Sequence, residues 1–457
     1  MNIVIVGAGE LGRYIATLLS KEEHNIIIID KDPKKIEAVS QNIDVAVRHG
    51  SGTDWQLLDD LHELSPDLLI AITDNDETNL VACSIAKNLG YPHTIARIHD
   101  NRYLNRTRLD FGRIFDVDYF IGPELLVANE ILKYMMSPGS IHVENFAHGA
   151  VQLRTLVVPS KWRHNGKKIH ELDLPHAIMI GLIERETDEK RGGIPTGKKQ
   201  VIFPHGSDTL QAGDEVSFIG ETNAISEIHQ FFGSSSKSIK SVVILGGTPT
   251  AINLAKLLEP RNISVTIIDK NYDTCCLLAE HLPDCVIINH DGTDIEFLRS
   301  EKVGTNDIFV ACTNHDEVNL MGAVLGKEVG CQNAVVVLSN NSFAPFAAQL
   351  GINHTVSPKI SASNHILSQI LSGTVRSLVS IYDNQAEIME VNVSTGSSIV
   401  GIPLCELGPL LPSDFLIAMI QNRGRIMIAN GNRIISSGDT VIVITSPKHV
   451  KELEKIF

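Results

Sequence analysis

Three glycines near the N-terminus are spaced in a way that could bind phosphate. Gly7, Gly9 and Gly12 follow the G-x-G-x-x-G pattern, between the β-branched run 2–6 and an apolar-periodic helical stretch. The first glycine of this pattern allows a tight turn, the second lets the backbone approach a pyrophosphate, and the third lets the helix pack on the strand. The phosphates then lie at the positive end of a helix. The predicted phosphate loop comprises Gly7, Ala8, Gly9, Glu10, Leu11 and Gly12.

A carboxylate follows this loop at the distance expected for ribose binding. The run 26–29 predicts a second strand, and it ends in Asp30, where a carboxylate could accept the ribose hydroxyls of NAD. We expect NAD(H) to be preferred over NADP(H), because Asp30 would repel a 2′-phosphate, although neighbouring Lys31 weakens this preference. The alternative is a tight strand-to-helix turn that binds nothing.

Residues after the later strands could border the same crevice, since ligands of open α/β sheets bind at the carboxyl ends of the strands. Arg97 could bind phosphate through its fixed fork of donors. Alternatively, Asn75 or Asp76 only caps the following helix, and we expect Glu77 and Asn79 to be structural. The candidate binding residues in this part of the chain are Lys31, Ser51, Gly52, Thr53, Thr73, Asp74 and Arg97.

The chain repeats its opening unit. Gly246 and Asp269 each follow their counterparts, Gly7 and Asp30, by 239 residues, and the run 313–319 follows the similar run 73–79 by 240. This agreement indicates a tandem duplication. The candidate binding residues of the second half are Gly246, Gly247, Thr248, Pro249, Thr250, Asp269, Asp291, Gly292, Thr313 and Asn314.

The two predicted sites are unequal. Thr248 and Ala251 occupy the positions of Gly9 and Gly12, and Val337 occupies that of Arg97. A Cβ at the second glycine position pushes a pyrophosphate away. We therefore expect the second site to be weaker or differently selective, and a decayed site kept for packing is an equally open interpretation.

The arrangement of elements predicts an α/β fold. In each half, short strand runs alternate with helical stretches, which is typical of a parallel, doubly wound sheet. Each half then becomes strand-rich and turn-rich, so we predict two tandem Rossmann-like sheets, each followed by a small α+β lobe. A charged insertion at 186–200 predicts a solvated hairpin loop, and 233–238 a flexible linker. The predicted domains are 1–136, 137–232, 239–372 and 373–457.

Composition excludes several classes of function. The net charge of −15 over 457 residues argues against binding of nucleic acid or anionic lipid. No apolar run approaches the length of a membrane span, and the chain opens on a strand, so we expect a cytoplasmic protein. The cysteines show neither even pairing nor C-x-x-C spacing, and we interpret them as small buried hydrophobes: Cys83, Cys275, Cys276, Cys285, Cys312, Cys331 and Cys405.

No catalytic or metal-binding constellation is present in the sequence, so we predict no catalytic residue and no metal ligand. H-E-x-x-H and G-x-S-x-G are both absent. The histidines near the predicted crevices lack metal-ligand spacing and are expected to be polar lining: His49, His99, His290 and His315. A basic island could pair across an interface or form a solvated helix face: Arg102, Arg106, Arg108 and Arg113.

The order of domains, Gly-Ala-Gly-Glu-Leu-Gly at 7–12, the distal Asp30 and the run 73–79 together resemble the TrkA family. These proteins are peripheral cytoplasmic regulatory subunits of bacterial Trk potassium-uptake systems, built from two copies of the domain that regulates potassium conductance. The resemblance covers essentially the whole chain. It implies binding of NAD(H) and of ATP or ADP. It also implies assembly into a homo-oligomeric ring, a dimer of dimers, beneath a membrane-embedded Trk-type potassium channel subunit. Two alternatives stay open: an NAD-dependent oxidoreductase, and a regulator of another ion transporter.

Overall fold

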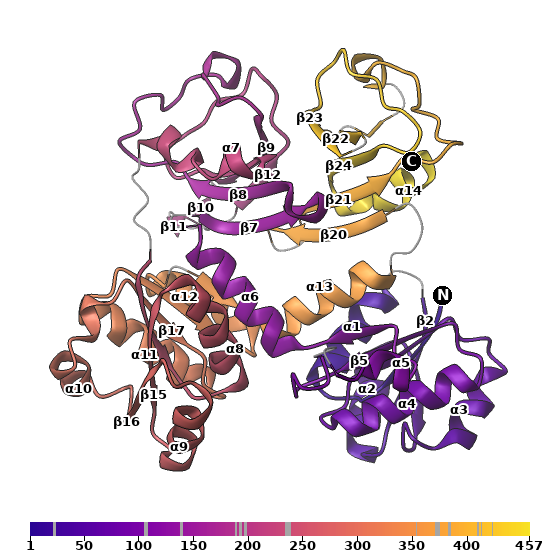
Figure 1. The fold of residues 1–457 in the computed structure, drawn as a ribbon. Coiled ribbons are helices and arrows are strands. Elements are labelled where there is room, and N and C mark those ends of the chain that lie inside the picture. Colours follow the sequence, from indigo (N-terminus) through magenta and orange to yellow (C-terminus); the bar gives the residue numbers. More distant parts are fainter. Residues whose placement is uncertain are drawn as a thin grey trace. The chain divides into compact units, whose positions relative to one another are not determined.

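The structure is a computed structural model (Figure 1) that describes the chain apart from residues 22–23, 105–107, 138–139, 188–189, 192–193, 196–198, 234–238, 353, 371–374, 383–384, 409–410, 413 and 423. The predicted linker beyond Gly233, and Arg106, therefore lie outside the described residues. Among the described residues, no helix has the length and apolar composition needed to cross a membrane.

The first half folds into a parallel six-stranded sheet with the order β3-β2-β1-β4-β5-β6. Its strands are β1 (Asn2–Val6), β2 (Asn25–Asp30), β3 (Ala46–His49), β4 (Leu68–Ala71), β5 (His93–Arg97) and β6 (Tyr119–Ile121). The helices are α1 (Glu10–Ser20), α2 (Pro33–Asn42), α3 (Trp55–His62), α4 (Asp76–Asn88), α5 (Phe111–Ile114) and α6 (Pro123–Met135). The strand order reverses beside β1, so the carboxyl ends of β1 and β4 border a crevice.

The second half repeats this sheet with the order β16-β15-β14-β17-β18-β19. Its strands are β14 (Ser241–Leu245), β15 (Ser264–Asp269), β16 (Val286–Asn289), β17 (Ile308–Ala311), β18 (Asn333–Val337) and β19 (His354–Val356). The helices are α8 (Pro249–Leu258), α9 (Tyr272–His281), α10 (Ile295–Ser300), α11 (Asp316–Glu328), α12 (Ala344–Gln349) and α13 (Pro358–Ile370). The duplication inferred from the sequence therefore extends to the order of the strands.

An antiparallel sheet follows each Rossmann half. The first, ordered β12-β9-β13-β8-β7, comprises β7 (Ser140–Phe146), β8 (Val151–Val157), β9 (Ile178–Glu186), β12 (Lys199–Ile202) and β13 (Glu215–Glu221), followed by α7 (Thr222–Ile225). The second, ordered β20-β21-β24-β22-β23, comprises β20 (Val375–Ile381), β21 (Ala386–Asn392), β22 (Phe415–Asn422), β23 (Arg425–Ile428) and β24 (Thr440–Thr445), followed by α14 (Val450–Ile456). The predicted fold class is confirmed.

The chain forms two compact units, one made of both Rossmann halves (1–132 and 240–366) and one made of both lobes (133–239 and 367–457). In the second unit each lobe has an apolar core of its own, and a further apolar core joins the two lobes, with Phe146 and Ile219 from one and Met419 and Ile444 from the other. Figure 1 shows β7 and β8 of the first lobe beside β20 and β21 of the second. The two lobes are therefore joined by a shared core in addition to their own cores. The four predicted domain boundaries stay a prediction.

The cysteines and the charged insertion at 186–200 can be compared with their predictions. The cysteine interpretation is wrong for Cys276 and Cys405, which are exposed. On α9, buried Cys275 and exposed Cys276 are adjacent and so point to different sides of the helix. In the charged insertion, β10 (Lys190–Arg191) pairs antiparallel with β11 (Ile194–Pro195), as a hairpin requires, and the rest of the insertion lies partly outside the described residues.

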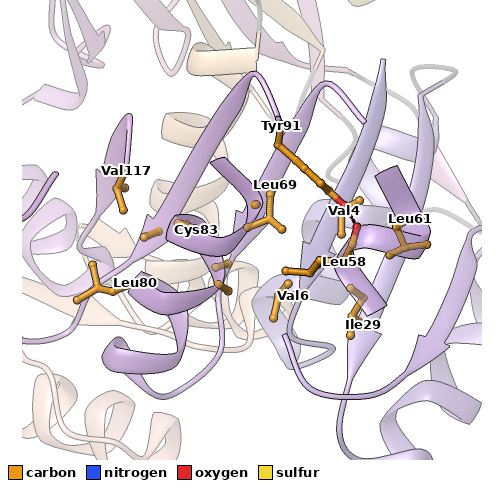
Figure 2. Close-up of a cluster of buried hydrophobic side chains, with 14 of the residues drawn as sticks. Val4, Val6, Ile29, Leu58, Leu61, Leu69, Leu80, Cys83, Tyr91 and Val117 are labelled. Carbon is orange, nitrogen blue, oxygen red and sulfur yellow. Dashed lines mark hydrogen bonds between the residues drawn. The ribbon is translucent and has the colours of Figure 1, made fainter. Parts of the chain in front are cut away.

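The core beneath the first sheet joins strands and helices that are distant in sequence (Figure 2). Val4, Val6 and Leu69 come from the strands, and Leu58 comes from α3. Tyr91 is buried among them, and its hydroxyl donates a hydrogen bond of 2.9 Å to the Leu58 carbonyl oxygen. This hydrogen bond fixes α3 against the chain that precedes β5, and burial raises the pKa of Tyr91 to about 12.

The hydrogen bond of Tyr91 provides a test of this core. We expect Tyr91→Phe to lower the free energy of unfolding by about 1–3 kcal/mol, because the buried Leu58 carbonyl loses its donor. Urea unfolding curves of the full chain measure the change. Tyr119→Phe, at a residue that is 43% exposed, is the matched control and should leave the curve unchanged. Equal curves for Tyr91→Phe and the wild type would contradict this assignment.

Candidate functional site

The three glycines of the first turn have different structural requirements. Gly7 has a φ of +113°, and a Cβ on Gly12 would lie 2.0 Å from the Gly7 carbonyl oxygen. Both positions therefore need glycine for the fold itself. A Cβ on Gly9, in contrast, would meet no atom within 4 Å. Gly9 thus faces open space, where a ligand could approach the backbone.

Asp30 supports the glycine turn through its own side chain. One carboxylate oxygen accepts a hydrogen bond from the Ala8 N–H at 2.6 Å, and the other accepts one from the Asp32 N–H at 2.8 Å. Asp269 repeats this arrangement with the N–H groups of Gly247 at 2.6 Å and Asn271 at 2.8 Å. Each carboxylate oxygen keeps a further lone pair for a ligand hydroxyl. The sequence pattern did not reveal this structural role.

A buried asparagine ties together the ends of β4 and β5. The Asn79 side-chain oxygen accepts hydrogen bonds from the Thr73 N–H at 2.9 Å and its hydroxyl at 2.7 Å. The Asn79 side-chain N–H₂ donates to the carbonyl oxygens of Thr73 at 3.1 Å and Arg97 at 2.9 Å. Asn319 makes the same four contacts with Thr313 and Val337. The expectation that Asn79 is structural agrees with these contacts.

The first cleft is a cavity of about 220 Å³ at the carboxyl ends of β1 to β4. It brings together predicted residues from four separate loops, as expected for a crevice of this fold. The lining residues are Val6, Gly7, Gly9, Ile29, Asp30, Lys31, Lys35, Gly50, Ser51, Gly52, Ile72, Thr73, Asp74, Asn75 and Thr78. The lining residues that were not predicted as binding residues are Val6, Ile29, Lys35, Gly50, Ile72, Asn75 and Thr78.

A second space, which we call the bridging cavity, has a volume of about 480 Å³ and is lined by both Rossmann halves. It shares Gly9, Lys35, Ile72 and Asp74 with the first cleft. Its lining residues are Ala8, Gly9, Glu10, Leu11, Arg13, Lys35, Ile72, Asp74, Arg97, Pro123, Ser339, Pro358 and Lys359. Four cationic side chains therefore line the cavity at the start of α1: Arg13, Lys35, Arg97 and Lys359. Gly9, which precedes α1, makes no side-chain capping hydrogen bond.

Arg97 and Lys359 reach the bridging cavity from different halves. The Arg97 guanidinium lies 3.7 Å from an Asp74 carboxylate oxygen and 3.6 Å from one of Glu124, and its Nε atom is buried with no hydrogen-bond partner among the described residues. The Lys359 ammonium lies 5.4 Å from the centroid of the Tyr14 ring, a cation–π contact that holds α13 beside α1. Arg97 thus retains donor capacity for an anion.

The second cleft, a cavity of about 360 Å³, lies at the equivalent edge of the second sheet. Its lining residues are Leu245, Gly246, Gly247, Thr248, Pro249, Ile268, Asp269, Lys270, Thr274, Asp291, Gly292, Thr293, Thr313, Asn314, His315 and Val318. Hydrogen bonds from Thr293 lower the pKa of Asp291, so this carboxylate is ionised at neutral pH. Lys270 is the cationic residue among these lining side chains.

Several predicted residues lie outside these cavities. Gly12 packs on Gly7, Thr53 shares a 2.9 Å hydrogen bond with the Ser51 hydroxyl, and Thr250 is buried. Gly52 and Gly292 line their clefts but are also required for packing, because a Cβ there would lie 2.1 Å from Val6 and 2.3 Å from Leu245 respectively. The role of each predicted residue in contacting a ligand stays a prediction.

The alternative that Asn75 or Asp76 caps the following helix is confirmed for Asn75. The Asn75 side chain accepts a hydrogen bond from the Thr78 N–H at 2.7 Å and begins α4. Asp76 instead accepts hydrogen bonds from the backbone and ring of His99 and from the Asp100 N–H. The run therefore begins the helix and also places Thr73 and Asp74 at the cleft.

The histidines and arginines outside the phosphate loops can also be placed. Of the four histidines expected to line crevices, His315 does so. The others are not among the lining residues of the three cavities described above: His49 contacts the Lys31 carbonyl, His99 contacts Asp76, and His290 stacks on Phe297. Their role as crevice lining stays a prediction. The described arginines of the basic island are exposed, but they do not share a helix face, because only Arg113 lies in a helix, α5: Arg102, Arg108 and Arg113.

Comparison with known proteins places this geometry in a family. The TrkA-N domain family matches residues 3–115 and 242–358, and the TrkA-C domain family matches 153–233 and 388–457. Trk system potassium uptake protein TrkA homolog 1 of Methanosarcina mazei is 30% identical over 465 residues, with all of both chains covered. The chain belongs to the TrkA family. Trk system potassium uptake protein TrkA of Haemophilus influenzae is also 30% identical, with 100% of this chain and 98% of that protein covered.

Solved structures share the fold of this TrkA-family chain. The crystal structure of the GsuK RCK domain has a TM-score of 0.61 at 16% identity, covering 100% of this chain and 94% of that one. The GsuK channel bound to NAD has a TM-score of 0.61 at 16% identity, covering 100% and 78% of the two chains. The tandem arrangement of Rossmann sheets and lobes is therefore found in known structures.

The Asn79 contacts predict a measurable effect on stability. We expect Asn79→Ala to lower the free energy of unfolding by about 2 kcal/mol or more, because it leaves buried groups of Thr73 and Arg97 unpaired. Denaturant unfolding of the full chain measures this loss. Asn88→Ala is the control, since Asn88 lies on the same helix with an exposed hydrogen bond to Ser84. A change no larger than that of the control would show that the contacts contribute little.

Proposed function

We propose that the chain is a nucleotide-sensing regulatory subunit of a Trk-type potassium uptake system, and that its first Rossmann half binds NAD(H) and adenine nucleotides. The observation that supports it best is the first cleft, where the uncovered backbone at Gly9 and the carboxylate of Asp30 lie at the same edge of the sheet. Membership of the TrkA family supports the same reading.

The residues around the first cleft fit the charges of a nucleotide. Asp30 would accept the ribose hydroxyls, and the backbone N–H groups from Gly9 onward would hold phosphate at the start of α1. Arg13, Lys35 and Arg97 would neutralise further phosphate charge in the adjoining bridging cavity. Bound nucleotide acts here as a signal, and the proposal includes no turnover.

The bridging cavity suggests how occupancy of the first cleft would be transmitted. It is lined by residues of both halves, so a nucleotide that extends into it would contact Lys359 as well as Arg97. Nucleotides that differ in phosphate number would then stabilise different arrangements of the two halves. A ligand shifts such an equilibrium by its differential affinity for the two states.

The proposal also concerns assembly and location. We expect a cytoplasmic protein, peripheral on the inner face of the membrane, that forms a homo-oligomeric ring with a membrane-embedded Trk-type potassium channel subunit. Two protein relatives, from Methanosarcina mazei and Haemophilus influenzae, are named for Trk potassium uptake, which supports this choice of partner. The net charge of −15 argues against a nucleic acid as a partner.

A substitution at Gly9 separates ligand binding from folding. Gly9 has a φ of −66° and a ψ of −173°, which alanine also adopts, and its Cβ would meet no protein atom. Gly9→Ala should therefore leave unfolding unchanged and lower affinity for NADH by about tenfold or more, a loss of about 1.4 kcal/mol. Calorimetric titration measures the affinity. Gly396→Ala, also at an uncrowded glycine, is the control, and equal affinity in all three proteins would refute this site.

Potassium flux tests the regulatory role directly. The full chain would be reconstituted with its Trk-type channel subunit in vesicles, and ATP, ADP and NADH would be added in turn. We expect the flux to change with the nucleotide, and Gly9→Ala to reduce that response. Unchanged flux with all three nucleotides, or steady NADH oxidation by the isolated chain with a small substrate, would reject regulation in favour of an alternative.

A further inference from the structure

The two phosphate loops differ in how the following helix begins. Gly9 precedes α1 and makes no side-chain capping hydrogen bond. At the matching position, the Thr248 hydroxyl accepts a hydrogen bond from the Ala251 N–H at 3.4 Å and donates one to the Cys312 carbonyl at 2.8 Å. Pro249 supplies no N–H group. In the second loop the Ala251 N–H is therefore already bonded, and Pro249 has no N–H to donate. The first loop has neither of these restrictions at the matching positions.

The cationic side chains around the first loop also have no cationic counterparts in the second half. Arg13, Lys35 and Arg97 line the bridging cavity. At offsets of 239, 239 and 240 residues, the duplicated positions hold Ile252, Thr274 and Val337. Where α13 has Lys359 directly after its first proline, α6 has Glu124. A polyphosphate in the second half would therefore lose the positive charge that its counterpart meets in the first.

The charge lining the second cleft is predominantly negative. Asp269 and Asp291 line it together with one cation, Lys270. Burying several phosphate charges beside two carboxylates with one neighbouring cation is unfavourable, because opposite charge must compensate the lost hydration. The second cleft is therefore suited to a ligand without a string of phosphates.

The features that recognise a ribose persist in the second cleft. Asp269 holds the loop as Asp30 does, and its oxygens keep lone pairs for hydroxyl donors. Thr313 and Asn314 supply further polar groups, and Leu245 and Ile268 supply apolar walls. A volume of about 360 Å³ falls in the range of small-molecule sites.

We infer that the second cleft binds a neutral nucleoside, of the adenosine class, and that polyphosphate nucleotides bind in the first half. This inference rests on the proposed function, because it takes the first cleft as the nucleotide site. The two halves of one chain then respond to different ligands. The nucleoside occupies a cleft whose helix start is already capped by Thr248, so its binding needs no phosphate.

Titration of the full-length chain tests the inference, with ADP, NADH and adenosine as probes. We expect one ADP or one NADH per chain, and one adenosine that binds to protein already saturated with NADH. Asp269→Asn should weaken this adenosine binding by at least about tenfold, as measured by calorimetry. Asp284→Asn, at an exposed aspartate outside the cleft lining, is the matched control and should bind adenosine like the wild type.

A gain-of-function variant keeps the test independent of any damage caused by Asp269→Asn. Thr248→Gly combined with Val337→Arg restores the uncapped loop and the cation of the first half, and should raise the ADP stoichiometry from one to two. Two equal ADP sites in the wild type, or no adenosine binding to the NADH-saturated chain, would overturn the inference while leaving the proposed function intact. Absence of all nucleotide binding would overturn the proposed function itself.

Discussion

The clefts of this protein depend on a buried side-chain amide at the carboxyl edge of each Rossmann sheet. Asn79 joins the end of β4 to the end of β5 through Thr73 and Arg97, and Asn319 does the same between β17 and β18. Both asparagines are fully buried. Inside the protein, an amide with four partners holds its neighbours firmly, because any unpaired group there would carry its full desolvation cost. These hydrogen bonds fix the backbone at the ends of the strands, where Thr73 and Thr313 line their clefts.

Around this shared scaffold the two halves have diverged where packing does not constrain them. Gly7 and Gly246 both adopt positive φ, and Asp30 and Asp269 both accept a hydrogen bond from the loop that they support. These contacts concern folding, so both copies retain them. The side chains that differ include Thr248 before α8, where the first half has Gly9, and Val337 at the end of β18, where the first half has Arg97. Duplication thus preserves the frame while the side chains beside the two loops differ.

The lobes illustrate a second constraint, which is the size of a stable core. Each lobe sheet has few strands, and the two share the apolar core that includes Phe146 and Ile444. Within that unit, the Ala147 N–H donates to a Glu390 carboxylate oxygen at 2.9 Å, and the hydroxyls of Ser217 and Tyr382 lie 2.6 Å apart. Paired polar groups of this kind fix the register of one lobe against the other, since alternatives would leave them buried without partners. The lobe pair therefore forms one compact unit.

Local spacing in the sequence determined the tandem duplication, the two Rossmann sheets and the turn at Gly7, because these follow from repeated short patterns and from the conformation of a few neighbouring residues. The same reasoning anticipated that Asn79 is structural. The tertiary structure alone decided that Lys359 and Ser339 of the second half line a cavity beside the first phosphate loop. It also decided that the Thr248 hydroxyl is bonded to the Cys312 carbonyl and that a further apolar core joins the two lobes. These features arise from residues far apart along the chain, whose proximity depends on how whole sheets and helices pack, and no local pattern encodes that packing.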